Sequence, residues 1–248
     1  MKKETVYMYG THALEEALVG TPGLVLKVYL SRPAEGRLAE LLRAAKVPVG
    51  RFDDRTPPSG IEKHANHQGC IAEVRLDRLM RPYADFIESL PVTPDTGLVL
   101  LGEIQDPQNV GAIIRTAAAF GVKGVLIPER NQAPVTAAVV KVSAGMAFRV
   151  PLVSIGNVNA TIKDLKERGF WVYGLEMEAQ QSLVTEKFDA PAVFILGNEE
   201  KGIRMKTLEH CDVPLSIPMN PGCESLNVAA SAAAVLYAWS AKHPKALK

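Results

Sequence analysis

The sequence has few of the features that mark a secreted, membrane-spanning or metal-binding protein. Its 248 residues include only three cysteines, and the wide spacing of Cys70, Cys211 and Cys223 excludes a disulfide framework or a paired-cysteine metal site. The N-terminal letters MKKETVYMYG contain no apolar stretch behind the lysines, so we expect no signal peptide. The longest nearly apolar run, Val228–Trp239, is too short to cross a bilayer. These absences predict a cytoplasmic protein without a metal.

An excess of charge is also missing. The chain has 28 Lys and Arg against 27 Asp and Glu, and a formal charge of +1. Residues 1–76 carry 11 basic and 9 acidic side chains, residues 77–97 carry 2 and 4, and residues 98–248 carry 15 and 14. Bulk charge therefore does not indicate a nucleic-acid partner. An RNA partner would have to be recognised by shape and local contacts, with a shallow dependence of binding on salt.

Several common functional motifs are absent as well. The sequence contains no GxxxxGK[ST] phosphate loop, no GxGxxG after a strand and no GxSxG nucleophile turn. This excludes the usual signatures of P-loop nucleotide hydrolases, dinucleotide-binding enzymes and α/β-hydrolases. The histidines lack metal-ligand spacing; they are His12, His64, His67, His210 and His243.

The composition that remains, 47% hydrophobic and 22% charged, is typical of a globular protein, and its pattern predicts two α/β domains. Residues 1–76 alternate short strand-like and helix-like stretches and predict a small α/β domain. Residues 77–97 are interrupted by prolines and read as a linker with a short helix over Tyr83–Leu90. Residues 98–248 are expected to form a second, larger domain.

In this larger part, short apolar strands alternate with amphipathic helices. The alternation predicts a mostly parallel sheet with helices on both faces. The expected strands are Leu98–Leu101, Val122–Ile127, Val150–Ile155, Phe170–Gly174, Ala192–Leu196 and Val213–Ile217; the expected helices are Val135–Ser143, Asn157–Glu167, Leu226–Ala241 and one starting at Asp106.

Three polar, glycine-bearing loops follow strands of this sheet: Gly102–Gly111, Gly197–Gly202 and Pro218–Asn227. Ligands in open parallel sheets bind at the carboxyl ends of strands, so these loops predict the site. After the first loop, Asp106 and Pro107 form an N-cap and first-turn pair. Asn109 and Arg115 lie 120° apart on the helix that follows, so it does not bring them into one pocket. Spacing alone leaves Arg115 as a solvated side chain and Asn109 as a first-turn hydrogen bonder.

The other two loops also admit structural interpretations. Glu199 and Glu200 suit a cationic or hydroxyl-rich ligand, or form an acidic surface turn. Ser225 is expected to cap the apolar helix that follows it. Asn227 fits a polar site and a capping role equally well. The helix is apolar nearly all round, which predicts burial within this chain or against a partner chain.

Taken together, the three loops resemble the signature motifs of the SpoU-type RNA 2′-O-methyltransferases of the TrmH/SPOUT superfamily. The motifs are NVGAIIR from Asn109 to Arg115, LGNEEKG from Leu196 to Gly202, and IPM from Ile217 followed by ESLN ending at Asn227. Near the N-terminus, YGTHA from Tyr9 and HQG from His67 resemble the L30e-like substrate-binding domain of bacterial rRNA guanosine methyltransferases.

The resemblance implies more than the pattern does. It implies a trefoil knot in the C-terminal α/β methyltransferase domain, a small N-terminal L30e-like α/β domain, and a homodimer formed through the knotted domain. It also implies that S-adenosylmethionine is bound by residues Leu196, Gly197, Ile217, Met219 and Leu226. The glycine of the third loop lies one place later than in many members, which puts the path of that loop in question.

The implied reaction is methyl transfer to a ribose 2′-hydroxyl. Arg115 would act as the base or would orient a phosphate, and both roles stay open because a guanidinium normally titrates above pH 12. Asn109, Glu199, Ser225 and Asn227 would complete the catalytic set. The implied substrate is a guanosine in 23S rRNA; the alternatives are a tRNA and a non-catalytic RNA-binding role. Candidate RNA contacts in the first domain are Arg32, Arg37, Lys63 and His67.

Overall fold

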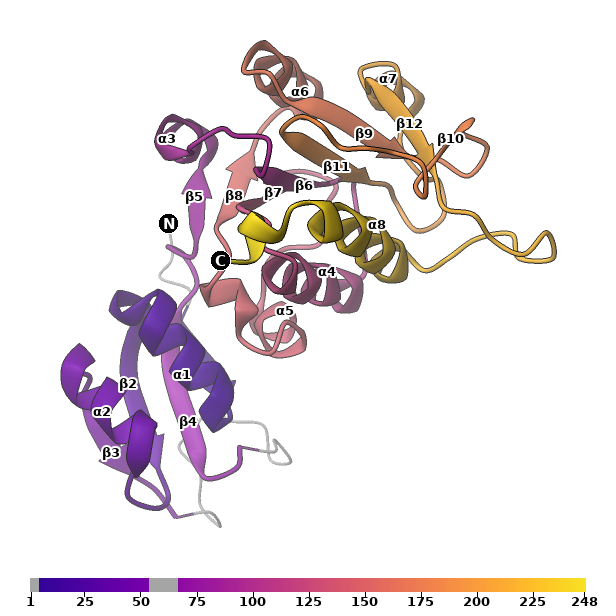
Figure 1. Cartoon of the computed structure of the whole chain (residues 1–248). Helices are drawn as coiled ribbons and strands as arrows, with labels where there is room; N and C mark the ends of the chain where they lie inside the picture. Colours follow the sequence, from indigo (N-terminus) through magenta and orange to yellow (C-terminus); the bar gives the residue numbers. More distant parts are fainter. Residues whose placement is uncertain (1–4, 54–66) are drawn as a thin grey trace. The chain divides into compact units, whose positions relative to one another are not determined.

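A computed structural model describes residues 5–53 and 67–248 of the chain, which divides into two compact units (Figure 1). The first unit contains the N-terminal part up to Met80 together with Val135–Arg149, and the second contains Arg81–Pro134 and Val150–Lys248. Each unit is described by itself below.

The first unit is built on a four-stranded sheet with the order β1-β4-β2-β3. Strand β4 pairs antiparallel with β1 and β2, and β3 pairs parallel with β2. The predicted α/β character is confirmed. Its strands are β1 (Thr5–Tyr9), β2 (Val25–Leu30), β3 (Val49–Arg51) and β4 (Cys70–Arg75), and its helices are α1 (Thr11–Gly20), η1 (Pro22–Leu24), α2 (Gly36–Ala45), α5 (Ala137–Val142) and η2 (Met146–Phe148).

A segment far along the chain completes this unit. The backbone carbonyl of Phe148 lies so close to α1 that a Cβ at Gly20 would be 1.9 Å from its oxygen. Arg149 forms an ion pair with Glu16 at 3.3 Å. The sequence prediction assigned Val135–Arg149 to the second domain because sequence order does not reveal that a crossover segment packs on a distant helix.

The second unit contains an eight-stranded sheet with the order β10-β12-β9-β11-β6-β7-β8-β5. Neighbouring strands from β10 to β8 run parallel, as the alternating pattern predicts. The strands are β5 (Met80–Pro82), β6 (Gly97–Leu101), β7 (Gly124–Pro128), β8 (Leu152–Ile155), β9 (Trp171–Leu175), β10 (Gln181–Ser182), β11 (Ala192–Leu196) and β12 (Val213–Ser216). The helices are α3 (Tyr83–Ser89), α4 (Pro107–Ala119), α6 (Val158–Glu167), α7 (Met205–Leu208), α8 (Val228–Lys242) and η3 (Pro244–Leu247).

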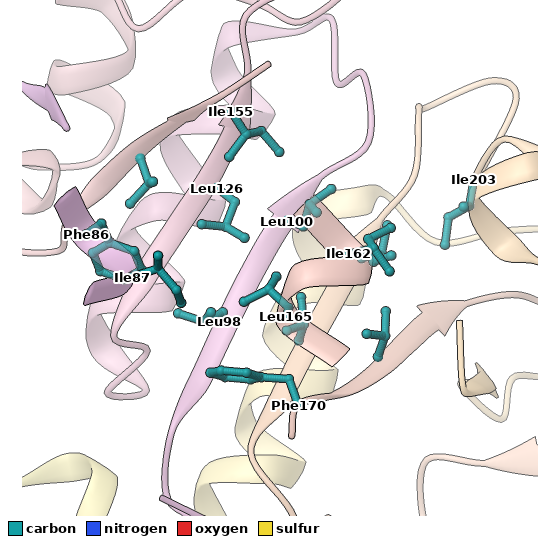
Figure 2. Packing of buried hydrophobic residues seen from close by; sticks show 14 residues of the cluster. Phe86, Ile87, Leu98, Leu100, Leu126, Ile155, Ile162, Leu165, Phe170 and Ile203 are labelled. Carbon is teal, nitrogen blue, oxygen red and sulfur yellow. The ribbon is translucent and has the colours of Figure 1, made fainter. Parts of the chain in front are cut away.

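Helices cover both faces of this sheet. Figure 2 shows Leu98, Leu100 and Leu126 of the strands packed with Ile162 and Leu165 of α6 and with Phe86 and Ile87 of α3. On β11, Val193 and Ile195 face this cluster, whereas Phe194 between them packs edge-on against Trp239 of α8. Because successive strand residues point to opposite faces, α8 and its neighbour α4 cover the other face.

Residues 77–97 form more structure than a linker. Phe86 and Ile87 are buried, and β5 joins the edge of the sheet beside β8. The apolar side chains of Phe86 and Ile87 anchor α3 to the core of the second unit. The short helix expected over Tyr83–Leu90 is confirmed as α3.

Helix α8 is buried along one side only. Val235, Leu236 and Trp239 have no exposed surface, whereas Tyr237 is 64% exposed. No helix in the described part of the chain is long and apolar enough to span a membrane. The knot implied by the resemblance stays a prediction.

Candidate active site

The site lies where the sheet changes winding direction. On one side of β6 the sheet continues with β7 and β8, which follow it in the chain. On the other side lie β11, β9 and β12, which come later in the chain. Open parallel sheets bind ligands at such a switch point, beyond the carboxyl ends of the strands. The loops that follow β6 and β11 leave the sheet there, and the residues between β12 and α8 line the same cleft as the β11 loop.

A chain of side-chain hydrogen bonds joins all three predicted loops. Asn109, buried in the first turn of α4, donates from Nδ2 to Glu199 Oε1 at 3.0 Å. Its Oδ1 accepts from Asn227 Nδ2 at 2.9 Å. Asn227 in turn accepts the backbone N–H groups of Ala229 at 2.8 Å and Ala230 at 3.3 Å. One buried amide therefore connects the first motif to the second and the third.

The Glu199 carboxylate is surrounded by donors. Its two oxygens accept the backbone N–H groups of Gln105 and Asp106, both at 3.1 Å, at the start of α4. Partial burial by itself raises the pKa of Glu199, but the hydrogen bonds from Asn109, Asp106 and Gln105 together outweigh burial and lower the pKa. Glu199 is thus held as an anion, and its fixed position favours a binding or structural role over proton transfer.

The second loop is a tight turn that only small residues permit. Asn198 and Gly202 exchange backbone hydrogen bonds at 3.0 Å, and the Asn198 side chain accepts from the N–H groups of Glu200 and Lys201. A Cβ at Gly197 would lie 2.4 Å from the Gly202 carbonyl carbon. This close approach explains the glycine at 197, whereas Gly202 has a φ of 65°, a conformation that favours glycine whatever the space around it.

Side chains outside the motifs hold the first loop. The Gln132 amide pairs twice with the Ile104 backbone, accepting from its N–H and donating to its C=O, both at 2.9 Å. Arg204 forms a two-armed ion pair with Glu103, with nitrogen–oxygen distances of 2.8 and 2.7 Å. These contacts fix the residues that present Gln105 and Asp106 to Glu199. The sequence analysis missed them because their partners are backbone atoms or residues about 100 positions away.

A cleft of about 540 Å³ opens beside the second and third loops. All five predicted cofactor residues line it, namely Leu196, Gly197, Ile217, Met219 and Leu226. Glu199, Ser225 and Asn227 line it too. In the described part of the chain, the backbone N–H groups of Met219 and Leu226 donate to no protein acceptor, so they can serve a ligand.

Other predicted residues lie differently from expectation. Helix α8 begins at Val228 with Asn227 as its cap, so the expectation that Ser225 caps it is wrong. Leu226 and Asn227 separate Ser225 from the helix. Asp106 does cap α4, accepting from Gln108 N–H at 2.8 Å. Arg115 is exposed, contacts no described residue through a hydrogen bond or ion pair, and does not line the cleft.

The cleft also has a wall that the sequence analysis did not consider. Glu176, Met177 and Glu178 follow β9 and line the cleft, although they belong to none of the predicted motifs. Their position at the carboxyl end of a parallel strand was the available signal.

The candidate RNA contacts belong to the first unit. Arg32 and His67 line a separate cleft there, whereas Arg37 is exposed and outside its lining. Lys63 lies outside the described residues. Nowhere in residues 5–53 and 67–248 do three or more His, Cys, Asp or Glu side chains gather in a way that could hold a metal ion.

Comparison with known proteins agrees with this organisation. The model of the SpoU rRNA Methylase family matches residues 97–237, and that of RNA 2′-O ribose methyltransferase substrate binding matches residues 7–80. The 23S rRNA (guanosine-2′-O-)-methyltransferase RlmB of Pseudomonas putida is 37% identical over 237 residues, covering 93% of this chain and 94% of the relative. RlmB of Neisseria meningitidis is 35% identical, covering 92% of each chain.

A solved structure gives the same fold. The SpoU methyltransferase AviRb from Streptomyces viridochromogenes, in complex with the cofactor AdoMet, aligns with a TM-score of 0.75 at 23% identity, over 97% of this chain and 91% of AviRb. From the family matches and the curated relatives together, the chain belongs to the SpoU rRNA methylase family.

Proposed function

We propose that the protein transfers a methyl group from S-adenosylmethionine to the ribose 2′-hydroxyl of a guanosine in 23S rRNA. The observation that carries the proposal is the hydrogen-bonded chain from Glu199 through Asn109 to Asn227, which joins the three motif loops at one cleft. The relatives from P. putida and N. meningitidis, named for this activity, match more than nine-tenths of the chain. Arg115, Glu199 and Asn227 are all present, whereas the loss of any of them would have favoured a non-catalytic RNA-binding homologue.

The cleft fits the cofactor. Its volume is in the range of small-molecule sites, and it combines apolar side chains from Leu196, Ile217 and Leu226 with the N–H groups that donate to no acceptor among the described residues. Such a lining can enclose a nucleoside and bind its edge through backbone atoms. When bound, S-adenosylmethionine supplies a methyl group on a sulfonium, and the 2′-oxygen gains that methyl as its hydroxyl loses a proton.

The residues of the chain must then align the hydroxyl and accept or direct its proton. Ser225 lies at the cleft and is exposed, so it is available to the ribose. Arg115 lies six residues beyond Asn109 on α4, about 9 Å along the helix axis. We assign it the base or phosphate-orienting role in a site completed by a second copy of the chain.

In a homodimer, Arg115 of one copy would reach the cofactor cleft of the other copy. The exposed side of α8 supports such an interface, because Tyr237 is exposed and packs edge-on against Phe120 at the end of α4. Tyr237→Glu would place a charge in the interface and convert the dimer to monomers in sedimentation velocity, with loss of methyl transfer.

The first unit, which contains the predicted domain of residues 1–76, serves RNA recognition in this proposal. Arg32, Arg37 and His67 are its candidate contacts, and an rRNA substrate agrees with a cytoplasmic location. The trefoil knot belongs to the same proposal for residues 98–248.

Deleting the gene and mapping 2′-O-methyl groups on all stable RNAs tests the proposal. We expect the loss of one mark in 23S rRNA. Loss of a tRNA mark instead would support the alternative substrate, and no loss would contradict the enzymatic function. For the purified protein, Arg115→Ala should keep S-adenosylmethionine affinity but lose most single-turnover activity, whereas the exposed Arg130→Ala should keep both.

A further inference from the structure

The first unit contains a second cleft, of about 600 Å³, formed entirely by its own elements. Its walls come from the start of α1, the connection between β2 and α2, and the turn that precedes β4. The polar side chains that matter are Thr11, Glu15, Ser31, Arg32, Glu35 and His67. This cleft shares no residue with the proposed cofactor cleft.

The turn before β4 gives the cleft a fixed wall. Gln68 and Gly69 both have positive φ angles, 50° and 75°, and a non-glycine residue in this conformation is uncommon. Ser31 N–H donates to Gly69 C=O at 3.0 Å, and a Cβ at Gly69 would lie 2.7 Å from Ser31 Oγ. Gly69 N–H donates to His67 Nδ1 at 3.1 Å, and Phe52 packs edge-on against that ring. The wall is therefore preformed.

The charges that line the cleft have mixed signs. Arg32 lines the cleft together with two carboxylates, Glu15 and Glu35, and none of these three side chains forms a hydrogen bond or ion pair with a described residue. Two acids against one arginine disfavour a site for a bare phosphate. The floor is apolar, because Leu30 and Leu38 are buried there.

A flat group with hydrogen-bond donors on one edge and acceptors on another suits such a lining. Unpaired RNA bases are recognised in this way, through their edges and faces. Guanine presents adjacent N–H donors at N1 and N2, which match carboxylates, and acceptors at O6 and N7, which match an arginine. Uracil offers a single N–H between two carbonyl oxygens.

We infer that this cleft binds an unpaired guanine of the RNA substrate, at a site separate from the methylated nucleotide. The inference rests on the proposed function, since it supplies the RNA. The two are tested by different readouts, because base binding is measured on the free protein and methyl transfer on rRNA.

The experiment titrates the full-length protein, saturated with S-adenosylmethionine, with GMP, AMP, CMP, UMP and inorganic phosphate, and follows amide NMR shifts. We expect GMP to shift residues of this cleft and to bind about tenfold tighter than UMP, the ratio given by one good base contact. Arg32→Ala and the double variant Glu15→Gln with Glu35→Gln should weaken GMP binding about tenfold and raise the KM for 23S rRNA with little change in kcat.

The matched controls are Arg43→Ala and Glu40→Gln, exposed residues of α2 outside the cleft lining. Both should bind GMP as the unmodified protein does. Phosphate binding as tightly as GMP, equal binding of UMP, or the absence of nucleotide-induced shifts in this cleft would overturn the inference. Intact GMP binding without methyl transfer to any RNA would count against the proposed function alone.

Discussion

The Asn109 side-chain amide lies 3.0 Å from the Glu199 carboxylate, although 90 residues of chain separate them. Because Asn109 is buried and both of its amide atoms are occupied, one by Glu199 and the other by Asn227, its orientation is fixed by its partners. This single amide sets the relative positions of the loops that follow β6 and β11 and of the start of α8.

Replacing Asn109 should separate these loops. Asn109→Ala leaves Glu199 and Asn227 without their shared partner, and we expect a loss of about 1–3 kcal/mol in the free energy of unfolding, measured with denaturant. Asn109→Asp keeps an acceptor for Asn227 but faces Glu199 with a second carboxylate, so methyl transfer should fall about a hundredfold. Gln108→Ala, in the same turn and exposed, is the control. Unchanged activity in Asn109→Asp would show that the amide does not position the site.

The lowered pKa of Glu199 predicts a pH dependence of stability. A carboxyl group whose pKa is lower in the folded state stabilises the protein above its ordinary value of 4.5, and this stabilisation disappears as the pH falls through the lower folded value. Denaturant unfolding at pH 7 and at decreasing pH should therefore show a steeper acid-side loss for the unmodified protein than for Glu199→Gln. Parallel curves would contradict the role of Glu199 as a hydrogen-bonded anion.

Asn227 has two functions that substitution can separate. Asn227→Ser keeps a cap for α8 but is too short to reach Asn109, so it should cost less stability than Asn227→Ala while activity falls. Asn227→Ala loses the cap as well and should cost about 1 kcal/mol. Ser225→Ala should leave stability unchanged, because Ser225 does not cap the helix. A destabilised Ser225→Ala protein would restore the capping interpretation of that residue.

Gln132 positions the first loop from a distance. Gln132→Ala leaves the backbone of Ile104, which has no exposed surface, without two hydrogen bonds, and the turn that presents Gln105 and Asp106 should loosen. We expect kcat to fall about tenfold, with a smaller fall in Gln132→Asn than in Gln132→Ala. A decrease in stability with kcat intact, or an equal effect in the exposed Arg130→Ala, would assign Gln132 a structural role only.

Much of the fold could be predicted because local patterns determine it. The strand Ala192–Leu196 matches its expected range, since short apolar runs between turn residues have few alternatives. The parallel sheet followed from strand and helix alternation. The expected start of the last helix was two residues early, because Ser225 and Asn227 are both good caps and local chemistry does not choose between them.

The features that could not be predicted from the sequence depend on packing between distant segments. Nothing local shows that Val135–Arg149 packs with α1, or that α3 supplies Phe86 and Ile87 to the core of the second unit. Helical spacing did show that Asn109 and Arg115 diverge, and the structure has Asn109 buried and Arg115 exposed. The pairing of Asn109 with Glu199 could not be read from spacing, because it depends on which strands are neighbours in the sheet.

The central claim is that the three joined loops form the site of a 2′-O-methyltransferase acting on 23S rRNA. The most direct measurement incubates the purified protein with S-adenosylmethionine carrying a labelled methyl group and with 23S rRNA lacking 2′-O-methyl marks, then locates the label by nuclease digestion and mass spectrometry. We predict label on the ribose 2′-oxygen of one guanosine, reduced about a hundredfold with Asn109→Asp. Label on a base, or no transfer to rRNA by the folded, cofactor-binding protein, would contradict the account.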